Sequence, residues 1–264
     1  MRTFWHACVG VVALALLVLA IGPQTVLGQD AADPATPHYA AAVQLQNHGT
    51  YDLAEQAWTK FIEQFKNDPR IGKARHYLGV CYFQQKKYDQ ALATFQDVIK
   101  NYPQLDILDA SFLYLGVTQY SQAQNGKPEP FDAAVDTFNT LLTTYPQGRF
   151  VADALFYRGE CYYLRGKKAE AIQAYSQLVS RFPTHKFLAD ALYALGVAQE
   201  ETGQFQDAAK TYDTFLQKFP ESHLAVEVGM RRGETLFATG QYDAAAKRFA
   251  AAAASPQFAH ADYA

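Results

Sequence analysis

The chain is poor in the residue types and patterns that carry most protein chemistry. It has three cysteines and a formal net charge of −3 over 264 residues. A charge balance this close to neutral offers no basic patch for nucleic acid and no polybasic segment for a membrane surface. The sequence also lacks the HExxH, GxSxG, GxGxxG and P-loop motifs. We therefore expect no enzymatic activity, no metal site, no small-molecule cofactor and no nucleic-acid partner.

The first 28 residues have the layout of a secretory signal peptide. A short positive start precedes an apolar run over residues 7–22, and the small residues Val26 and Gly28 lie three and one positions before a cleavage at Gln29. An uncleaved membrane anchor is the alternative, although the run is shorter than the ~20 residues that span a bilayer. We expect export to the periplasm or the extracellular space, so that only partners or an uncleaved N-terminal segment would bring the protein to a membrane.

A flexible leader is expected after the cleavage site. Residues 29–37 read QDAADPATP, and this Ala-, Asp- and Pro-rich composition favours irregular structure. Cys8 precedes the apolar run, so it is not the cysteine that follows such a run and carries lipid in bacterial lipoproteins.

Residues 38–256 repeat one pattern six times, mostly every 37 residues. Glycines recur at Gly79, Gly116, Gly159, Gly196 and Gly233. Alanines recur at Ala54, Ala91, Ala134, Ala171, Ala208 and Ala245. Four residues after each alanine stands an aromatic: Trp58, Phe95, Phe138, Tyr175, Tyr212 and Phe249. Prolines close five of the units, at Pro103, Pro146, Pro183, Pro220 and Pro256. Self-similarity at this period indicates stacked structural repeats.

Each unit reads as an antiparallel pair of helices. In the fifth unit an apolar segment with helical spacing ends before Gly203, a residue suited to the left-handed turn after a helix. An amphipathic segment follows, and Pro220 stops it. We expect Gly196 to allow close approach of the partner helix at Ala208, and Tyr212 to fill the space between successive units.

Two departures from the pattern concern the third unit and the end of the chain. The third unit has six extra residues, and its turn over 121–131 reads SQAQNGKPEPF. We interpret this as a loop insertion, which a fold tolerates at low cost. Residues 257–264 resemble the start of a seventh unit. The array then either belongs to a longer one or has its last unit covered by a partner.

The cysteines and histidines of the repeats suggest no site. Cys81 and Cys161 occupy equivalent positions two units apart, on the order of 20 Å from each other if helices pack at their usual spacing. A disulfide needs Cα atoms within about 7 Å, so we expect two buried free thiols. His185 and His223 fall in equivalent loops, where we expect them to be solvated.

The spacing of Leu195-Gly196, Ala208, Tyr212 and Pro220 resembles that of the tetratricopeptide repeat, and residues 38–256 share it. This resemblance implies an all-α, right-handed superhelical solenoid of antiparallel helix pairs. The longer unit, with FP or YP followed by a loop and DA, is similar to the repeats of exported bacterial envelope proteins. These include the periplasmic coordinator of the Tol–Pal system and the outer-membrane assembly lipoproteins.

The resemblance also implies a partner-binding set, because first helices of such repeats line the concave face. Counted from each glycine, positions three before, one after and four after share a face of the helix. The candidates at these positions are His76, Phe83, Tyr120, Phe156, Glu160, Tyr163, Tyr193, Glu200, Met230, Glu234 and Phe237. We expect apolar anchors along this face and an acidic group over the fourth to sixth units.

The expected function is a non-enzymatic scaffold of the cell envelope that holds a peptide segment or partner subunit on its concave face. One alternative is a structural segment of a longer array, with contacts through its C-terminal end. Another is a glycan-binding or enzyme-accessory module in which Tyr163 and Tyr193 act as stacking platforms.

Overall fold

All regular structure in the described part of the chain is helical. The computed structural model describes residues 33–125 and 130–254, which contain twelve α-helices and no strand. They are α1 (Ala35–Asn47), α2 (Tyr51–Gln64), α3 (Ile71–Gln84), α4 (Tyr88–Asn101), α5 (Leu108–Gln124), α6 (Pro130–Thr144), α7 (Val151–Leu164), α8 (Lys168–Arg181), α9 (Leu188–Glu201), α10 (Phe205–Lys218), α11 (Ala225–Ala238) and α12 (Tyr242–Ala253). Each odd-numbered helix pairs with the next even-numbered one, and we number these pairs units 1 to 6.

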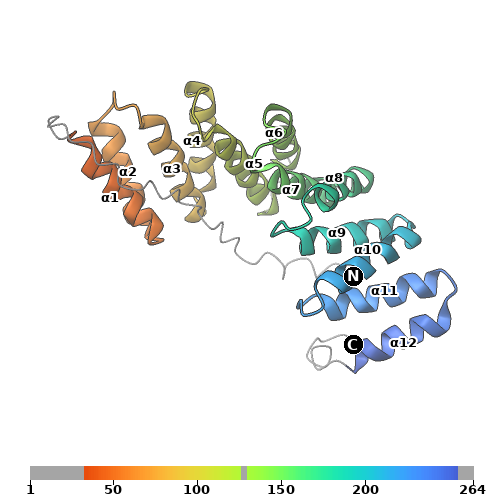
Figure 1. Cartoon of the computed structure of the whole chain (residues 1–264). Helices are drawn as coiled ribbons and strands as arrows, with labels where there is room; N and C mark the ends of the chain where they lie inside the picture. The colour runs from red at the N-terminus through yellow and green to blue at the C-terminus, as the bar shows by residue number, and fades with distance from the viewer. Residues whose placement is uncertain (1–32, 126–129, 255–264) are drawn as a thin grey trace.

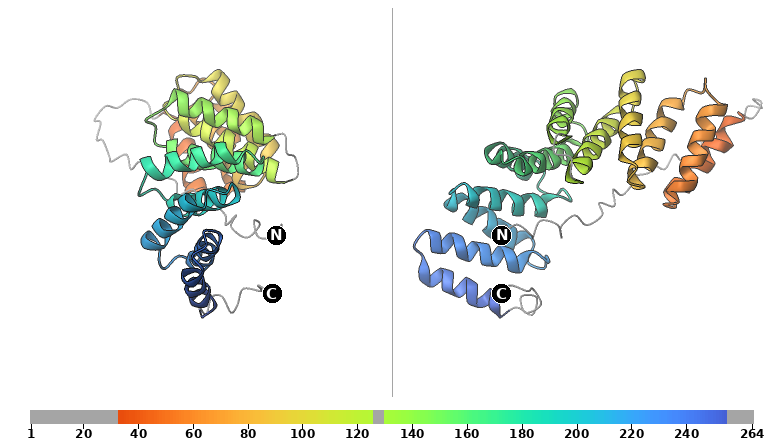
Figure 2. Two further views of the ribbon diagram at one scale, coloured as in Figure 1. Left: turned by 90° about the vertical axis from the view of Figure 1, so that its right-hand side faces the viewer. Right: turned by 180° about the vertical axis from the view of Figure 1, so that it is seen from behind.

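The six units form one curved row. Each helix contacts the next along the chain, and α3 contacts α5 and α5 contacts α7 across the unit boundaries. Figure 1 shows α5 and α7 toward the inner side of the bend and α6 and α8 toward its outer side, and Figure 2 shows the row from one end and from behind. This arrangement confirms the expected all-α solenoid of helix pairs. Among the helices of the described ranges, none is both long and apolar enough to cross a membrane.

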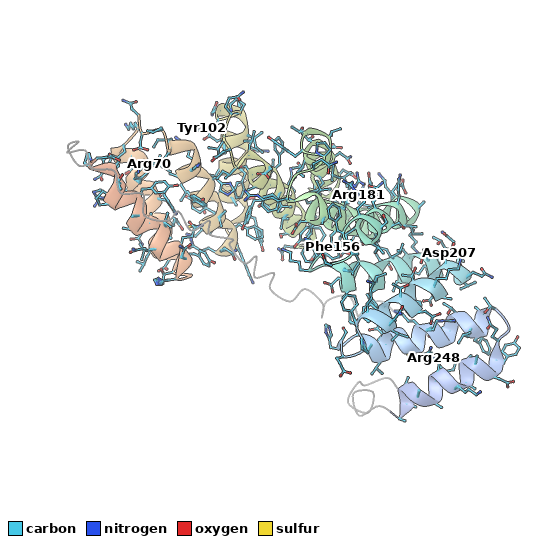
Figure 3. The ribbon with its side chains drawn as sticks, viewed as in Figure 1. Arg70, Tyr102, Phe156, Arg181, Asp207 and Arg248 are labelled. Atoms are coloured by element: carbon cyan, nitrogen blue, oxygen red, sulfur yellow. The ribbon has the colours of Figure 1, made fainter. Side chains whose placement is uncertain are left out.

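The first helix starts inside the segment that was expected to be a flexible leader. α1 begins at Ala35 because Asp33 accepts a hydrogen bond from the backbone N–H of Ala35 at 3.0 Å. The guanidinium of Arg70, labelled in Figure 3, lies 2.7 Å from the carboxylates of both Asp33 and Asp68. These contacts tie the chain to unit 2, so the predicted leader is too long at its C-terminal end. The predicted signal peptide lies outside the described residues.

The extra residues of unit 3 lengthen a helix as well as a turn. α5 runs to Gln124 and has 17 residues, against 14 in α3, α7 and α9. The first part of the expected 121–131 loop is therefore helical. The Gln122 side chain donates a hydrogen bond to Asp89 of unit 2 at 2.7 Å, which fixes this extension. The predicted start of a seventh unit, like residues 126–129, lies outside the described residues.

The repeat glycines make room for the aromatic residue of their own unit. A Cβ atom added to Gly116 would lie 2.5 Å from Cε1 of Phe138, and the glycines of units 2, 4, 5 and 6 face Phe95, Tyr175, Tyr212 and Phe249 in the same way. The partner helix does approach each glycine closely, but the nearest atoms belong to its aromatic ring and not to the small alanine that was expected there. The ring enters the space that a side chain on the glycine would fill, and glycine is required for that reason.

The same aromatic residues also stack on the next unit. The ring of Trp58 stacks on Tyr77 at 5.4 Å, Phe95 stacks on Tyr114 at 5.6 Å, and Phe138 stacks on Tyr157 at 6.1 Å. In each pair the tyrosine lies two residues before the glycine of the following unit. This ladder joins units 1 to 4 and ends at unit 5, where Ala194 takes the tyrosine's position. The prediction that aromatics fill the space between units holds for these three junctions.

The turns within the units need a left-handed backbone. Gly49, Gly166, Gly203 and Gly240 have φ between 73° and 79°, as predicted for Gly203, whereas unit 2 places Lys86 there with φ of 60°. Because a side chain strains this conformation, Lys86→Gly is expected to stabilise the protein by about 1 kcal/mol.

Urea unfolding measures this effect. The reverse change, Gly203→Lys, puts a lysine into a turn where nothing lies within 4 Å of an added Cβ, so it is expected to destabilise the protein by a similar amount through the backbone alone. An unchanged midpoint for both variants would contradict the account of the turn.

Both described cysteines are buried and free. Cys81 and Cys161 are each 0% exposed, and neither forms a disulfide. Burial raises the pKa of both thiols, which keeps them protonated and unreactive. The prediction of two buried free thiols is confirmed.

Candidate functional site

The predicted partner-binding residues fall into three classes of exposure. Those that are buried are His76, Tyr120 and Glu160. Those that are half-buried are Phe83, Phe156, Tyr163, Tyr193, Glu200 and Met230. Those that are exposed are Glu234 and Phe237. Their position in the repeat therefore does not by itself decide which side chains a partner can reach.

His76 lies in the core and not on the binding face where it was expected. Its Nδ1 is 2.9 Å from Oγ of Ser111 in the next unit, and its ring contacts those of Phe95 and Tyr114. Burial, with a smaller effect of Arg149, lowers the pKa of His76 to about 3 and keeps it neutral. The physical reason is the contact between α3 and α5, which covers the position three residues before the glycine.

Glu160 and Tyr120 are also in the interior. The hydroxyl of Tyr175 donates to Oε1 of Glu160 at 2.6 Å, and that of Tyr120 donates to Oε2 at 3.3 Å. Desolvation raises the pKa of Glu160 to about 7, against the lowering effect of these two hydrogen bonds. The acidic group that was predicted over units 4 to 6 is therefore absent from the surface of unit 4.

The half-buried aromatics are partly used in packing. Phe156 stacks on Phe187 with ring centroids 4.4 Å apart, and Figure 3 shows Phe156 on the inner side of the bend. Tyr163 donates to Oε2 of Glu201 at 2.8 Å. The ring of Tyr193 is covered by the guanidinium of Arg231 at 5.7 Å. A face that carries this cation is not an open stacking platform.

Unit 6 exposes aromatic side chains that other units cover. Residues four after the glycine reach the following unit: Phe83 contacts Tyr114, and Tyr120 contacts Tyr157. The equivalent Phe237 is 59% exposed and contacts Tyr242, which is 62% exposed. Their rings meet edge to face at 5.2 Å. This pair is the largest exposed aromatic feature in residues 33–125 and 130–254.

An acidic cluster surrounds one arginine at units 5 and 6. Arg231 lies 3.5 Å from Oε2 of Glu200 and 3.2 Å from Oε1 of Glu227. Glu234 forms no ion pair among the described residues. Desolvation by the surrounding side chains raises the pKa of Glu234 although the residue is exposed, and the neighbouring Glu200 raises it further. Three carboxyl groups around one guanidinium leave an excess of negative charge. We call Glu200, Glu227, Met230, Glu234, Phe237 and Tyr242 the unit 5–6 surface.

Arg231 was missed by the sequence-based site prediction. It stands two residues before the repeat glycine, where units 2 to 4 have Tyr77, Tyr114 and Tyr157. The change from tyrosine to arginine at this position is visible in the sequence and could have pointed to the cluster.

The histidines of residues 33–125 and 130–254 belong to no cluster of metal-ligating side chains. No group of three or more His, Cys, Asp or Glu residues that could hold a metal ion occurs among the described residues. His185 is less solvated than predicted, because its Nε2 lies 3.4 Å from the carboxylate of Asp153, whose side chain is 6% exposed. The Nδ1 of His185 lies 3.3 Å from the backbone N of Phe187, which donates to it.

Two family models match this chain. Residues 31–157 match the YfiO model, described as outer membrane lipoprotein. Residues 153–185 and 190–222 match a tetratricopeptide-repeat model, and these ranges correspond to units 4 and 5. No curated protein sequence matches the chain.

Several solved structures share the fold at low sequence identity. A tetratricopeptide repeat protein from Parabacteroides merdae is 15% identical, with a TM-score of 0.62 over 82% of this chain and 78% of its own. MamA from Desulfovibrio magneticus is 17% identical, with a TM-score of 0.60 over 72% and 98%. PilW, a type IV pilus biogenesis factor, is 16% identical, with a TM-score of 0.60 over 85% and 96%. At these identities the likeness shows the fold alone.

Proposed function

The chain is a tetratricopeptide-repeat protein, and from this premise we propose that it is a non-enzymatic scaffold of the cell envelope that holds a peptide segment or partner subunit on its inner face. The match of residues 31–157 to the outer membrane lipoprotein model supports an envelope location and export. The signal-peptide layout of residues 1–28 supports the same location.

The single observation that carries the binding proposal is the exposure of Phe237 beside Glu234. Both lie on one face of α11, three residues apart, and Met230 lies on the same face one turn earlier. In units 2 to 5 the residue at the position of Phe237 is buried or half-buried, whereas in unit 6 it is 59% exposed. A large exposed aromatic next to a carboxyl group that forms no ion pair among the described residues suits protein recognition better than it suits folding.

The chemistry of the unit 5–6 surface defines the segment it would bind. Phe237 and Tyr242 offer apolar contact area, and Glu234 and Glu200 offer negative charge. A complementary segment carries an apolar side chain next to a lysine or arginine. Burial of the apolar side chain supplies most of the affinity, and the charges set the orientation.

The double variant Glu234→Lys/Phe237→Ser tests this proposal. Used as bait from residue 29 to 264 in an envelope extract, it is expected to recover at least about tenfold less of the partner than the natural sequence does, since truncation of a hot-spot residue costs about 2 kcal/mol or more. Both side chains are exposed, so the urea midpoint is expected to stay the same.

A matched control uses one exposed apolar residue and one exposed glutamate of α2. Leu53 is 46% exposed and Glu63 is exposed, and both lie in unit 1, far along the row from α11. The variant Leu53→Ser/Glu63→Lys is expected to capture the partner normally. Equal capture by both double variants would rule out the unit 5–6 surface as the binding site.

A second candidate function is a structural segment that stacks through its last unit, and one observation favours it. Phe249 is half-buried, whereas Trp58, Phe95, Phe138, Tyr175 and Tyr212 are each 0% exposed. A further helix stacked on unit 6 would cover Phe249 and Tyr242. This function predicts that Glu234→Lys alone leaves the contact intact, which distinguishes it from peptide binding on the inner face.

A further inference from the structure

Unit 4 carries a carboxyl group at a position that is apolar in three other units. The residue that follows the repeat glycine is a buried valine in units 2, 3 and 5, namely Val80, Val117 and Val197. In unit 4 it is Glu160, which is 7% exposed. A carboxyl group at a core position of the repeat is costly to bury and is not needed for the fold.

This carboxyl group bridges two units through tyrosine hydroxyls. Tyr175 of unit 4 donates to Glu160 at 2.6 Å, and Tyr120 of unit 3 donates at 3.3 Å. Gln124, in the three-residue extension of α5, donates in turn to the hydroxyl of Tyr120. Units 2 and 3 have phenylalanine at the position of Tyr175, in Phe95 and Phe138. Unit 4 has thus replaced a valine–phenylalanine pair by a glutamate–tyrosine pair.

No cation compensates a charge on Glu160. It takes part in no ion pair within residues 33–125 and 130–254, and the polar and titratable groups that surround it are neutral or acidic. These groups are Tyr120 in α5, Tyr157 and Cys161 in α7, Tyr175 in α8 and Asp190 in α9. Asp132 in α6 acts on the Cys161 thiol and is paired with Arg165 at 2.7 Å. Glu200, which accepts the hydroxyl of Tyr212 in unit 5, differs because Arg231 lies 3.5 Å away.

We propose that the contact between units 3 and 4 is a pH-sensitive joint of the solenoid, closed when the Glu160 carboxyl is protonated and loosened when it ionises. An ionised carboxylate needs more hydrogen bonds than two hydroxyls supply, and water reaches it only if α7 separates from α5. Loosening this joint lets units 1 to 3 move relative to units 4 to 6. The curvature of the row then responds to pH.

The direction in which the joint responds to pH follows from the direction in which the pKa of Glu160 is shifted. Burial raises the pKa of Glu160 from 4.5 to about 7. A carboxyl group whose pKa is higher in the folded than in the unfolded protein stabilises the folded protein. This stabilisation is complete at a pH below the unfolded pKa and is lost as the pH rises through the folded pKa. The joint is therefore tight near pH 4.5 and loosens progressively as the pH approaches and passes 7.

The two equivalent cysteines provide a built-in measurement of the joint. Cys161 follows Glu160, and Cys81 follows Val80 at the same place in unit 2. Both thiols are 0% exposed and react only when their surroundings open. Alkylation with iodoacetamide, quantified for each cysteine by peptide mass spectrometry, gives the ratio of the Cys161 rate to the Cys81 rate. This ratio cancels the ordinary pH dependence that the two thiols share.

The ratio is expected to rise at least about tenfold between pH 5.5 and pH 8 in the natural sequence. It is expected to stay constant in Glu160→Gln, whose amide mimics the protonated carboxyl. The double variant Glu160→Val/Tyr175→Phe restores the pattern of units 2 and 3 and serves as a second pH-insensitive form. A negative charge on Glu160 in the closed state would slow Cys161, so a rise reports opening.

Two outcomes would overturn the proposal. The ratio could be independent of pH in the natural sequence, which would show that no local joint responds to pH, or it could rise equally in Glu160→Gln.

Discussion

Glu160→Lys is expected to destabilise the protein by about 3 to 5 kcal/mol, enough to unfold much of units 3 and 4. The side chain would put an ammonium group where the structure has a 7% exposed carboxyl and two tyrosine hydroxyls. No carboxylate among the described residues hydrogen-bonds at this place, and Asp190 is the acidic neighbour that acts on it, so the ammonium charge would be only partly compensated.

Urea unfolding followed by circular dichroism measures this loss. Glu234→Lys is the matched control, because Glu234 occupies the same position of its unit and is exposed. It is expected to change the free energy of unfolding by no more than about 0.5 kcal/mol. If both lysine variants proved equally stable, the burial of Glu160 would be wrong.

Gly116→Ala is expected to destabilise the protein by about 2 kcal/mol or more, although alanine favours a helix. The added Cβ would lie 2.5 Å from Cε1 of Phe138, whose ring is 0% exposed and stacked on Tyr157. Overpacking of this kind costs roughly 1–3 kcal/mol and more where the neighbour cannot move, against a gain in helix propensity of about 1 kcal/mol.

Gly229→Ala separates these two effects. Gly229 lies within α11, and nothing lies within 4 Å of a Cβ placed on it. This variant is expected to stabilise the protein by about 1 kcal/mol through helix propensity alone. Stabilisation by both alanines would contradict the close approach of ring and glycine.

The repeat architecture could be predicted from the sequence because its signals are local. The glycine that ends a first helix, such as Gly203 with φ of 76°, needs a left-handed backbone whatever surrounds it. The equivalence of Cys81 and Cys161 and their separation follow from the repeat count and the spacing of packed helices.

The binding residues were harder to predict because their exposure depends on contacts between units. His76 is covered by α5, while Phe237 at a comparable inner position is 59% exposed because no helix among the described residues covers it. The packing partner of each glycine was also misassigned, since the sequence does not show that the ring of Tyr212 reaches back to Gly196. The hydroxyl of Tyr212 also needs a hydrogen-bond acceptor, and the carboxylate of Glu200 is that acceptor.

Site-specific photo-crosslinking tests the central proposal most directly. A photo-reactive phenylalanine analogue placed at Phe237 is expected to form an adduct with the partner in cells, because that side chain would lie in the interface. The same analogue at Leu53, which is 46% exposed in unit 1, is expected to form none. Adducts of equal yield at both positions, or an adduct at Leu53 alone, would contradict the assignment of partner binding to the unit 5–6 surface.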